Sequence, residues 1–253
     1  MLKPATLAAI LFLSFSPAQA AVMQATWTGT ILSGYDGTAT WGPGSTDLTG
    51  VGYTMTFLYD TSLGIRTTSP GQFDQVYGGS DYPGGATDPV LSATMTIRGQ
   101  TQSGTGANQG YLYTQDAALG GNVFQNIAYD FASQPNGSFV YHYMYGLFDD
   151  LMQAGSPVTP SSLDTPFTGT VPGSALCASS GAYCGWFQFA DYNAALGAYT
   201  TYSWATFGVD SLTVRALPVA PVPLPAGAAT LLAAIAILVG LRSARARRPE
   251  PGA

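Results

Sequence analysis

Hydrophobic and polar residues alternate with a period of two along much of the chain. In residues 90–98 this alternation puts Leu, Ala, Met and Ile on one face and Ser, Thr, Thr and Arg on the other. Successive side chains of a strand point to opposite faces, so the pattern is typical of a half-buried strand. Turn signals rich in Gly, Pro, Asn and Asp, such as Gln134 to Gly137, separate similar stretches. The predicted strands are residues 23–32, 52–60, 90–98, 110–114, 123–131, 138–148, 183–189, 199–207 and 209–215.

Nine short strands without a convincing helix predict an all-β domain over residues 21–216. An antiparallel β-sandwich or a jelly roll fits this pattern best. The composition agrees, because Thr, Tyr, Val and Phe favour strands and Gly favours turns. A single helical turn is predicted around residues 149–153, where Asp149 and Asp150 precede Leu151 and Met152 and suit a helix N-terminus.

The first 20 residues have the pattern of a secretory signal peptide, which would form an N-terminal helix. Lys3 is followed by an apolar stretch over residues 5–15, and Ala18 and Ala20 are the small residues that a signal peptidase reads. The apolar stretch is too short to span a membrane stably. We therefore predict export and cleavage by signal peptidase, with the mature chain beginning near Ala21.

The other end of the chain predicts a membrane anchor. Residues 226–241 are an uncharged, proline-free apolar run that predicts a transmembrane helix, and residues 242–253 form a basic tail. Basic residues favour the cytoplasmic side, so residues 21–216 should face outward. The prolines in residues 217–225 indicate a stiff, extended spacer. The stop-transfer residues are Arg242, Arg245, Arg247 and Arg248.

A five-residue motif joins the spacer to the apolar run, and an arginine cluster follows. The motif consists of Val222, Pro223, Leu224, Pro225 and Ala226. This order resembles the VPLPA-CTERM variant of the PEP-CTERM family of sorting signals. The resemblance covers about the last 30 residues and implies recognition by an exosortase-type transpeptidase that cuts near the motif. The expected location is the membrane with the domain outside, or the cell surface and extracellular space after the tail is cut.

The charge between the two ends excludes some partners. Residues 21–225 contain three arginines and thirteen aspartates, with no lysine and no glutamate. A region with ten net negative charges repels nucleic acid, so no nucleic-acid partner is expected. Charged residues make up 9% of the whole chain, well below the level of ordinary soluble domains.

Cys177 and Cys184 are the only cysteines. An even number of cysteines in an exported chain favours a structural disulfide. A zinc site would need further ligands, and a redox centre would have the closer C-x-x-C spacing.

No catalytic residue is predicted. His142 is the only histidine, and alternation puts it on the same face as Val140 and Met144, opposite the neighbouring tyrosines. We interpret it as a strand histidine rather than as a general base. A hydrolase is the third functional hypothesis. Glycosidase chemistry usually needs two facing carboxylates, but Asp149 and Asp150 are adjacent in the chain and so do not form such a pair.

No cofactor is predicted, and calcium is a minor alternative. Several aspartates lie in glycine-rich turns, where carboxylates and carbonyls can supply the oxygens that calcium takes. Aspartate is also a common turn residue without any metal. The candidates are Asp36, Asp47, Asp60, Asp74, Asp81 and Asp88.

Aromatic residues make up 12% of the chain, and Trp41, Tyr77 and Tyr82 lie in or near loops where exposure is expected. Exposed rings indicate a carbohydrate-binding module, with extracellular polysaccharide as a partner, whereas buried rings would only fill the core. The leading prediction is a non-enzymatic, exported surface or extracellular-matrix protein held at the cell envelope by its sorting tail. The carbohydrate-binding module is the second hypothesis.

Overall fold

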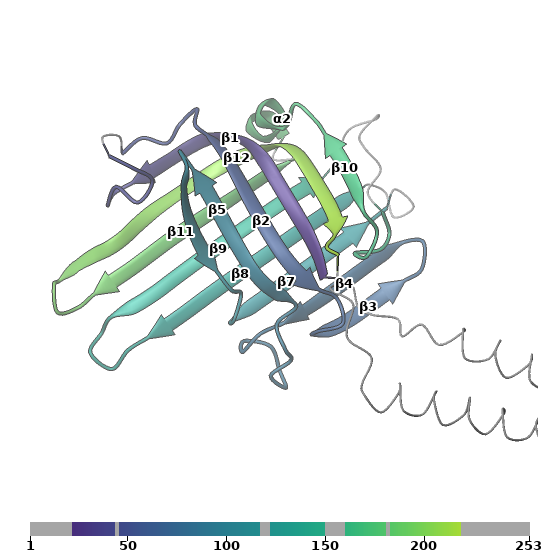
Figure 1. The fold of residues 1–253 in the computed structure, drawn as a ribbon, viewed down its shortest axis with the longest axis horizontal. Helices are drawn as coiled ribbons and strands as arrows, with labels where there is room; N and C mark the ends of the chain where they lie inside the picture. The colour runs from purple at the N-terminus through teal and green to yellow at the C-terminus, as the bar shows by residue number, and fades with distance from the viewer. Residues whose placement is uncertain (1–21, 44–45, 117–121, 150–159, 181–182, 219–253) are drawn as a thin grey trace, which may run out of the picture. The chain divides into compact units, whose positions relative to one another are not determined.

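The computed structural model of the protein describes residues 22–43, 46–116, 122–149, 160–180 and 183–218. These residues belong to one compact unit, Ala20–Pro218. Within the described residues there are twelve strands and one short helix (Figure 1). The elements are β1 (Val22–Asp36), β2 (Gly52–Asp60), β3 (Ile65–Ser69), β4 (Phe73–Gly78), β5 (Val90–Ile97), β6 (Gln100–Gly104), β7 (Gln109–Gln115), β8 (Val123–Ser133), β9 (Phe139–Asp149), β10 (Phe167–Thr170), α2 (Gly173–Ser180), β11 (Cys184–Asn193) and β12 (Ala198–Ala216).

All the described strands belong to a single sheet in which paired strands are antiparallel. The strand order is β3-β4-β7-β8-β9-β11-β12-β1-β2-β5-β6, and β10 pairs with β12 beside this path. The prediction of an all-β, antiparallel fold is therefore confirmed. A sandwich or jelly roll would have two separate sheets. Here the two halves belong to one sheet, because β12 and β1 continue the ladder from one half into the other.

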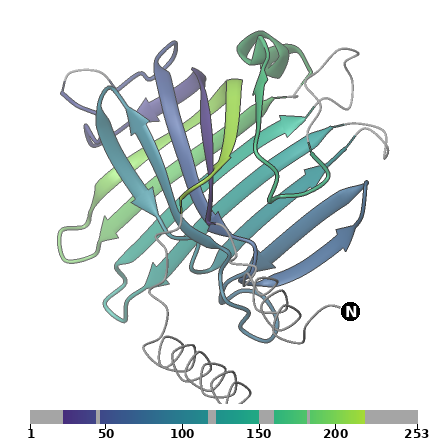
Figure 2. The same cartoon turned by 45° about the vertical axis from the view of Figure 1, so that its right-hand side comes forward.

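The sheet curls where its two longest strands bend. The pairing of β1 with β12 shifts between Thr28 and Gly29, and again between Ile31 and Ser33. Such bulges bend a strand and increase its twist. At Gly29 the two backbones are so close that a β-carbon would collide with the carbonyl oxygen of Gly208. As a result β1, β2 and β5 lie across β8, β9 and β11, and the two halves of the sheet face each other (Figure 1, Figure 2).

The core fills the space between the two halves. Alternation along the strands turns side chains such as Met55 and Phe57 inward, where they are fully buried. Trp27 extends from β1 across the core to the β9 backbone, where a β-carbon on Gly146 would come within 3.0 Å of its ring. The indole N–H of Trp27 donates a hydrogen bond to Oδ1 of buried Asn126 at 3.1 Å. Glycine at position 146 thus leaves room for the largest side chain of the opposite half.

One end of the core is closed by the loop that follows β1. Trp41 is fully buried, and its ring lies 5.6 Å from that of Phe187 and 5.8 Å from that of Phe189. The carboxylate of buried Asp36 accepts the backbone N–H groups of Thr40 and Trp41, each at 2.9 Å. The expected exposure of Trp41 is therefore wrong, because the carboxylate of Asp36 holds the loop against the core.

The segment before β10 packs against the other half of the core. Leu163 is fully buried, its carbonyl accepts the hydroxyl of Tyr59 at 2.9 Å, and its N–H donates to Asp74 at 2.9 Å. Arg66 of β3 forms an ion pair with the buried carboxylate of Asp74 at 2.6 Å and a second one with Asp164 at 2.8 Å. The Arg66 ion pairs thus join an edge strand to a segment nearly 100 residues later.

The predicted strand at residues 52–60 has the bounds of β2, and most of the others differ from the structure by a few residues. Three corrections apply. Residues 199–207 and 209–215 form one strand, β12, because Gly208 continues the ladder with Thr30 and Cys184. The short strands β3, β4, β6 and β10 were not predicted, and neither was α2. In β3 and β6 most side chains are exposed and polar, so no apolar face marks them.

Several predictions lie outside the described residues. These are the signal peptide, the sorting motif, the transmembrane helix and the basic tail, together with residues 150–153 of the predicted helical turn. Asp149, the first residue of that turn, is instead the last residue of β9. No helix within the described ranges is long and apolar enough to cross a membrane.

Candidate functional site

The two faces of the curled sheet carry different aromatic residues. Six phenylalanines are fully buried on the inner face, namely Phe57, Phe124, Phe148, Phe187, Phe189 and Phe207. Most tyrosines alternate instead to the opposite side, which we call the outer face, whereas Tyr53, Tyr59 and Tyr183 are buried in the core. The outer-face tyrosines are Tyr35, Tyr77, Tyr111, Tyr113, Tyr129, Tyr141, Tyr143, Tyr145, Tyr192, Tyr199 and Tyr202. Because a tyrosine hydroxyl needs a polar partner, a face built from tyrosine suits contact with water or with a polar ligand.

The strand register lines up the outer-face side chains in rows that cross the strands. We name the two central rows after their tryptophans. The Trp186 row consists of Ile65, Tyr77, Tyr111, Ile127, Tyr145, Trp186, Thr206 and Ser33. The Trp204 row consists of Gln109, Tyr129, Tyr143, Gln188, Trp204 and Tyr35. Neither row contains a charged residue.

Neighbouring rings hold one another in place at the centre of this face. The rings of Tyr143 and Trp186 are 4.5 Å apart and inclined by 26°. Tyr129 lies 5.5 Å from Tyr141 and 6.1 Å from Tyr143, again on adjacent strands. Aromatic pairs at such distances are mutually attractive. The outer face is therefore an ordered aromatic surface rather than a set of independent side chains.

The tyrosine hydroxyls of the two central rows are uncharged. Burial among neighbouring rings raises the pKa of Tyr143 to about 12, and it raises the pKa of Tyr111 to about 12 as well. In both cases the nearby tyrosines add to the shift. These hydroxyls therefore stay protonated at any physiological pH and remain hydrogen-bond donors.

Trp204 and Tyr35 are the most accessible rings of the Trp204 row. They lie directly opposite each other on β12 and β1, and their side chains are 36% and 42% exposed. In the part of the chain that the structure describes, the indole of Trp204 has no ring partner. Its face is therefore available to a flat apolar surface of a ligand.

His142 and Ser203 lie on the inner face but do not form a catalytic pair. Nε2 of His142 lies 2.9 Å from Oδ1 of Asp191, and the imidazole packs against Phe189 with the ring centres 5.1 Å apart. Ser203 is fully buried, and Phe189 stands between it and His142 in the cross-strand register. The Asp191 contact agrees with the interpretation of His142 as a hydrogen-bonded strand histidine.

The aspartates considered for calcium are spread over several turns. Asp47, Asp60 and Asp88 each accept a backbone N–H two residues later, which is an ordinary turn contact. Asp81 lies 3.2 Å from the amide of Asn108, whereas Asp36 and Asp74 are buried and bonded as described above. Among the described residues, no group of three or more His, Cys, Asp or Glu side chains is arranged to hold a metal ion.

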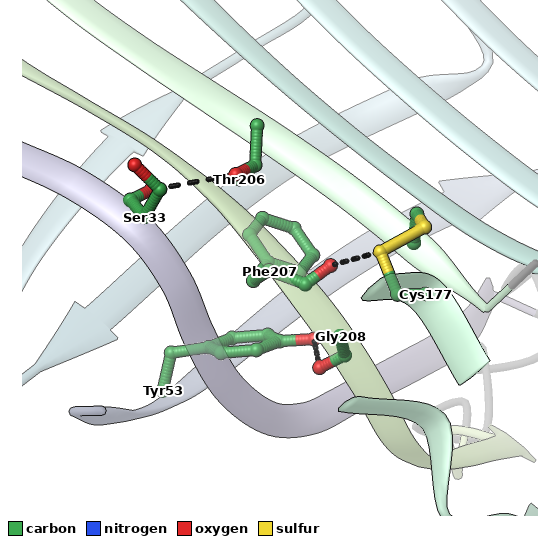
Figure 3. The surroundings of a disulfide bond; sticks show 7 residues. Ser33, Tyr53, Cys177, Thr206, Phe207 and Gly208 are labelled. Atoms are coloured by element: carbon green, nitrogen blue, oxygen red, sulfur yellow. Dashed lines mark hydrogen bonds between the residues drawn. A yellow bond between two sulfur atoms is a disulfide. The ribbon is translucent and has the colours of Figure 1, made fainter. Parts of the chain in front are cut away.

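Cys177 of α2 and Cys184 at the start of β11 are joined by a disulfide, with their Cα atoms 5.2 Å apart. Figure 3 shows this bond beside Phe207 of β12, whose carbonyl oxygen lies 3.6 Å from the sulfur of Cys177. Tyr53, also drawn there, donates its hydroxyl to the carbonyl of Gly208 at 3.2 Å. The bond thus ties α2 to the start of β11, beside the core strand β12.

Of the residues in the two central rows, only one was predicted from the sequence to be an exposed aromatic residue. Tyr77 lies in the Trp186 row, and the ring of Tyr82 packs 4.8 Å from it. The sequence feature that could have identified this face is the alternation of tyrosine at 141, 143 and 145, opposite the inward-facing residues of β9. The remaining members come from distant strands, so only the register brings them together.

Comparisons with known proteins add no family or function. No protein-family profile matches the chain, and no curated protein and no solved structure matches it. The features that bear on function are therefore the geometry of the outer face and the pattern at the chain ends.

Proposed function

We propose that this protein is a non-enzymatic, exported protein of the cell surface or extracellular matrix that binds extracellular polysaccharide through its outer face. The observation that carries the proposal is the gathering of eleven tyrosines and two tryptophans on the outer face, opposite an inner face on which six phenylalanines are fully buried. Sugars offer both apolar ring faces and hydroxyl groups. The two central rows offer rings, hydroxyls and amides without a charged residue, and so match both features.

The chain ends support the same setting. A secretory signal over residues 1–20 and a VPLPA-type tail would place residues 21–216 on the outer side of the membrane, where polysaccharide is found. An exosortase-type transpeptidase would then recognise the sorting motif. The aspartate-rich composition of the domain argues against nucleic acid as a competing partner.

The hydrolase hypothesis finds less support. A serine nucleophile must lie within hydrogen-bond reach of its histidine. Phe189 separates Ser203 from His142 in the cross-strand register. A binding role uses the features that the outer face offers and needs no such arrangement.

A binding assay tests the proposal. The full-length chain, purified in a detergent without a sugar headgroup, should be retained by immobilised polysaccharide extracted from the producing cells. Trp204→Ala combined with Tyr35→Ala should abolish most of the retention, because both accessible rings of the Trp204 row are removed. Leu91→Ala is the control, since Leu91 is similarly exposed, at 43%, but lies on β5 in the other half of the sheet. Equal retention of all three proteins would contradict the proposal.

A further inference from the structure

Several features of the Trp204 row indicate how a polysaccharide would bind. This inference rests on the proposed function. The row runs perpendicular to six neighbouring strands, from β7 to β1. Neighbouring strands are about 4.8 Å apart, so the row extends over roughly 24 Å. That length suits several consecutive sugar units rather than one monosaccharide.

Rings and amides are both available along this row. Trp204 lies between Gln188 on β11 and Tyr35 on β1. Within the described residues the side-chain amide of Gln188 has no hydrogen-bond partner, so it is free to donate to and accept from ligand hydroxyls. At the far end, the amide of Gln109 is engaged with the hydroxyl of Tyr82 at 3.0 Å. The free polar and aromatic groups thus concentrate at the β11–β12–β1 end.

The chemistry of the row selects the class of ligand. An apolar partner, such as a lipid surface or the hydrophobic core of a protein interface, would bury the Gln188 amide and the tyrosine hydroxyls without partners, which is unfavourable. An anionic polysaccharide would find no cation in the row and would meet the negative charge of an aspartate-rich domain. A neutral glycan meets neither obstacle, because its ring faces match Trp204 and Tyr35 and its hydroxyls match Gln188.

We infer that the Trp204 row binds one neutral polysaccharide chain lengthwise across the strands, with sugar rings stacked on Trp204 and Tyr35 and a sugar hydroxyl bonded to Gln188.

Calorimetric titration of the full-length chain tests this inference, again in a detergent without sugar headgroups. The probes are cello-, xylo-, manno- and chito-oligosaccharides of increasing length, together with an anionic uronic-acid polymer. Affinity for at least one neutral series should rise with chain length and change little with salt, because no ion pair contributes. Trp204→Ala should weaken it about tenfold, and Gln188→Leu should weaken it severalfold.

Phe131→Ala is the matched control, because Phe131 is 43% exposed on the same face but lies outside the Trp204 row. Its affinity and its dependence on chain length should equal those of the wild type. Thermal unfolding of each variant separates loss of binding from loss of fold. Affinity for the anionic polymer alone, or affinity independent of chain length, would overturn the inference and leave the proposed function standing. Retention by the cells' own polysaccharide without affinity for any neutral series would also overturn only the inference. Binding to no polysaccharide at all would overturn both the inference and the proposed function.

Discussion

Asp88 is a residue whose acidity depends on the packing around it. Its Oδ1 accepts the N–H of Val90 at 2.8 Å, and its carboxylate fills the space beside Gly106 and Gly110, where a β-carbon would collide with its oxygens. Burial raises the pKa of Asp88 to about 7, and the nearby charge of Asp130 adds to the shift, although the Val90 hydrogen bond opposes it. The folded protein therefore keeps a proton that the unfolded chain releases.

This proton makes stability depend on pH. Between about pH 4 and pH 7 the unfolded chain has lost the Asp88 proton while the folded protein still holds it, so the contribution of Asp88 to the free energy of unfolding falls as pH rises. Asp88→Asn should remove this slope, and urea unfolding at a series of pH values measures it. Asp47→Asn is the control. Hydrogen bonds from Thr49 lower the pKa of Asp47, so its contribution is lost only as the pH falls below about 4. Parallel stability curves for the wild type and Asp88→Asn would contradict the prediction.

The helix α2 depends on its neighbours more than on its own sequence. It has eight residues, with no acidic residue in its first turn and no basic residue in its last turn. Helices this short are only marginally stable by themselves. Its contacts are with β12, β1 and β11, and the disulfide from Cys177 to Cys184 ties it to the start of β11. We therefore expect α2 to be the element most affected by reduction.

Replacing both cysteines tests this expectation. Cys177→Ser with Cys184→Ser should lower the free energy of unfolding by about 2 kcal/mol, because the unfolded chain regains the entropy of a short closed loop. Denaturant titration measures the change, and the wild-type protein under reducing conditions should match the double variant. The β signal in circular dichroism should persist, since the core strands do not depend on α2. An unchanged unfolding midpoint would show that the bond contributes nothing to stability.

At the level of the whole chain, we propose that processing of the tail determines whether the domain remains attached to the membrane. Prolines 223 and 225 lack backbone donors and bias the residues before them to extended geometry, which a protease-like cleft requires of its substrate. If an exosortase-type enzyme reads the motif, the mature protein ends near Ala226 and lacks Arg242 to Arg248. A plain anchor would keep them. The two outcomes differ in mass.

Intact-mass measurement of the native, envelope-extracted protein distinguishes the outcomes. We expect a mature form without the arginine tail, and Pro223→Ala with Pro225→Ala should trap the uncut form. Arg245→Lys is the control, since it keeps the charge of the tail and leaves the motif intact. A wild-type protein that retains all four arginines in cells with an active exosortase would contradict processing.

The sequence by itself determined the all-β class and most strand positions. Side chains alternate across a strand, so the order of residues in β2 and β5 directly indicates which face is buried. The same local logic failed for β3 and β6. These strands occupy the two edges of the sheet and expose most of their polar side chains, which makes them resemble loops.

Only the tertiary structure decided what the outer face is. Trp204, Gln188 and Tyr35 lie on three strands, and Tyr35 is separated by more than 150 residues from the other two, so the strand register alone places them side by side. Trp41 shows the same limit in the opposite direction, because its glycine-rich loop suggested exposure while the carboxylate of Asp36 holds it inside the core. Alternation along one strand says which way a side chain points. Pairing and curling of the sheet determine what it then meets.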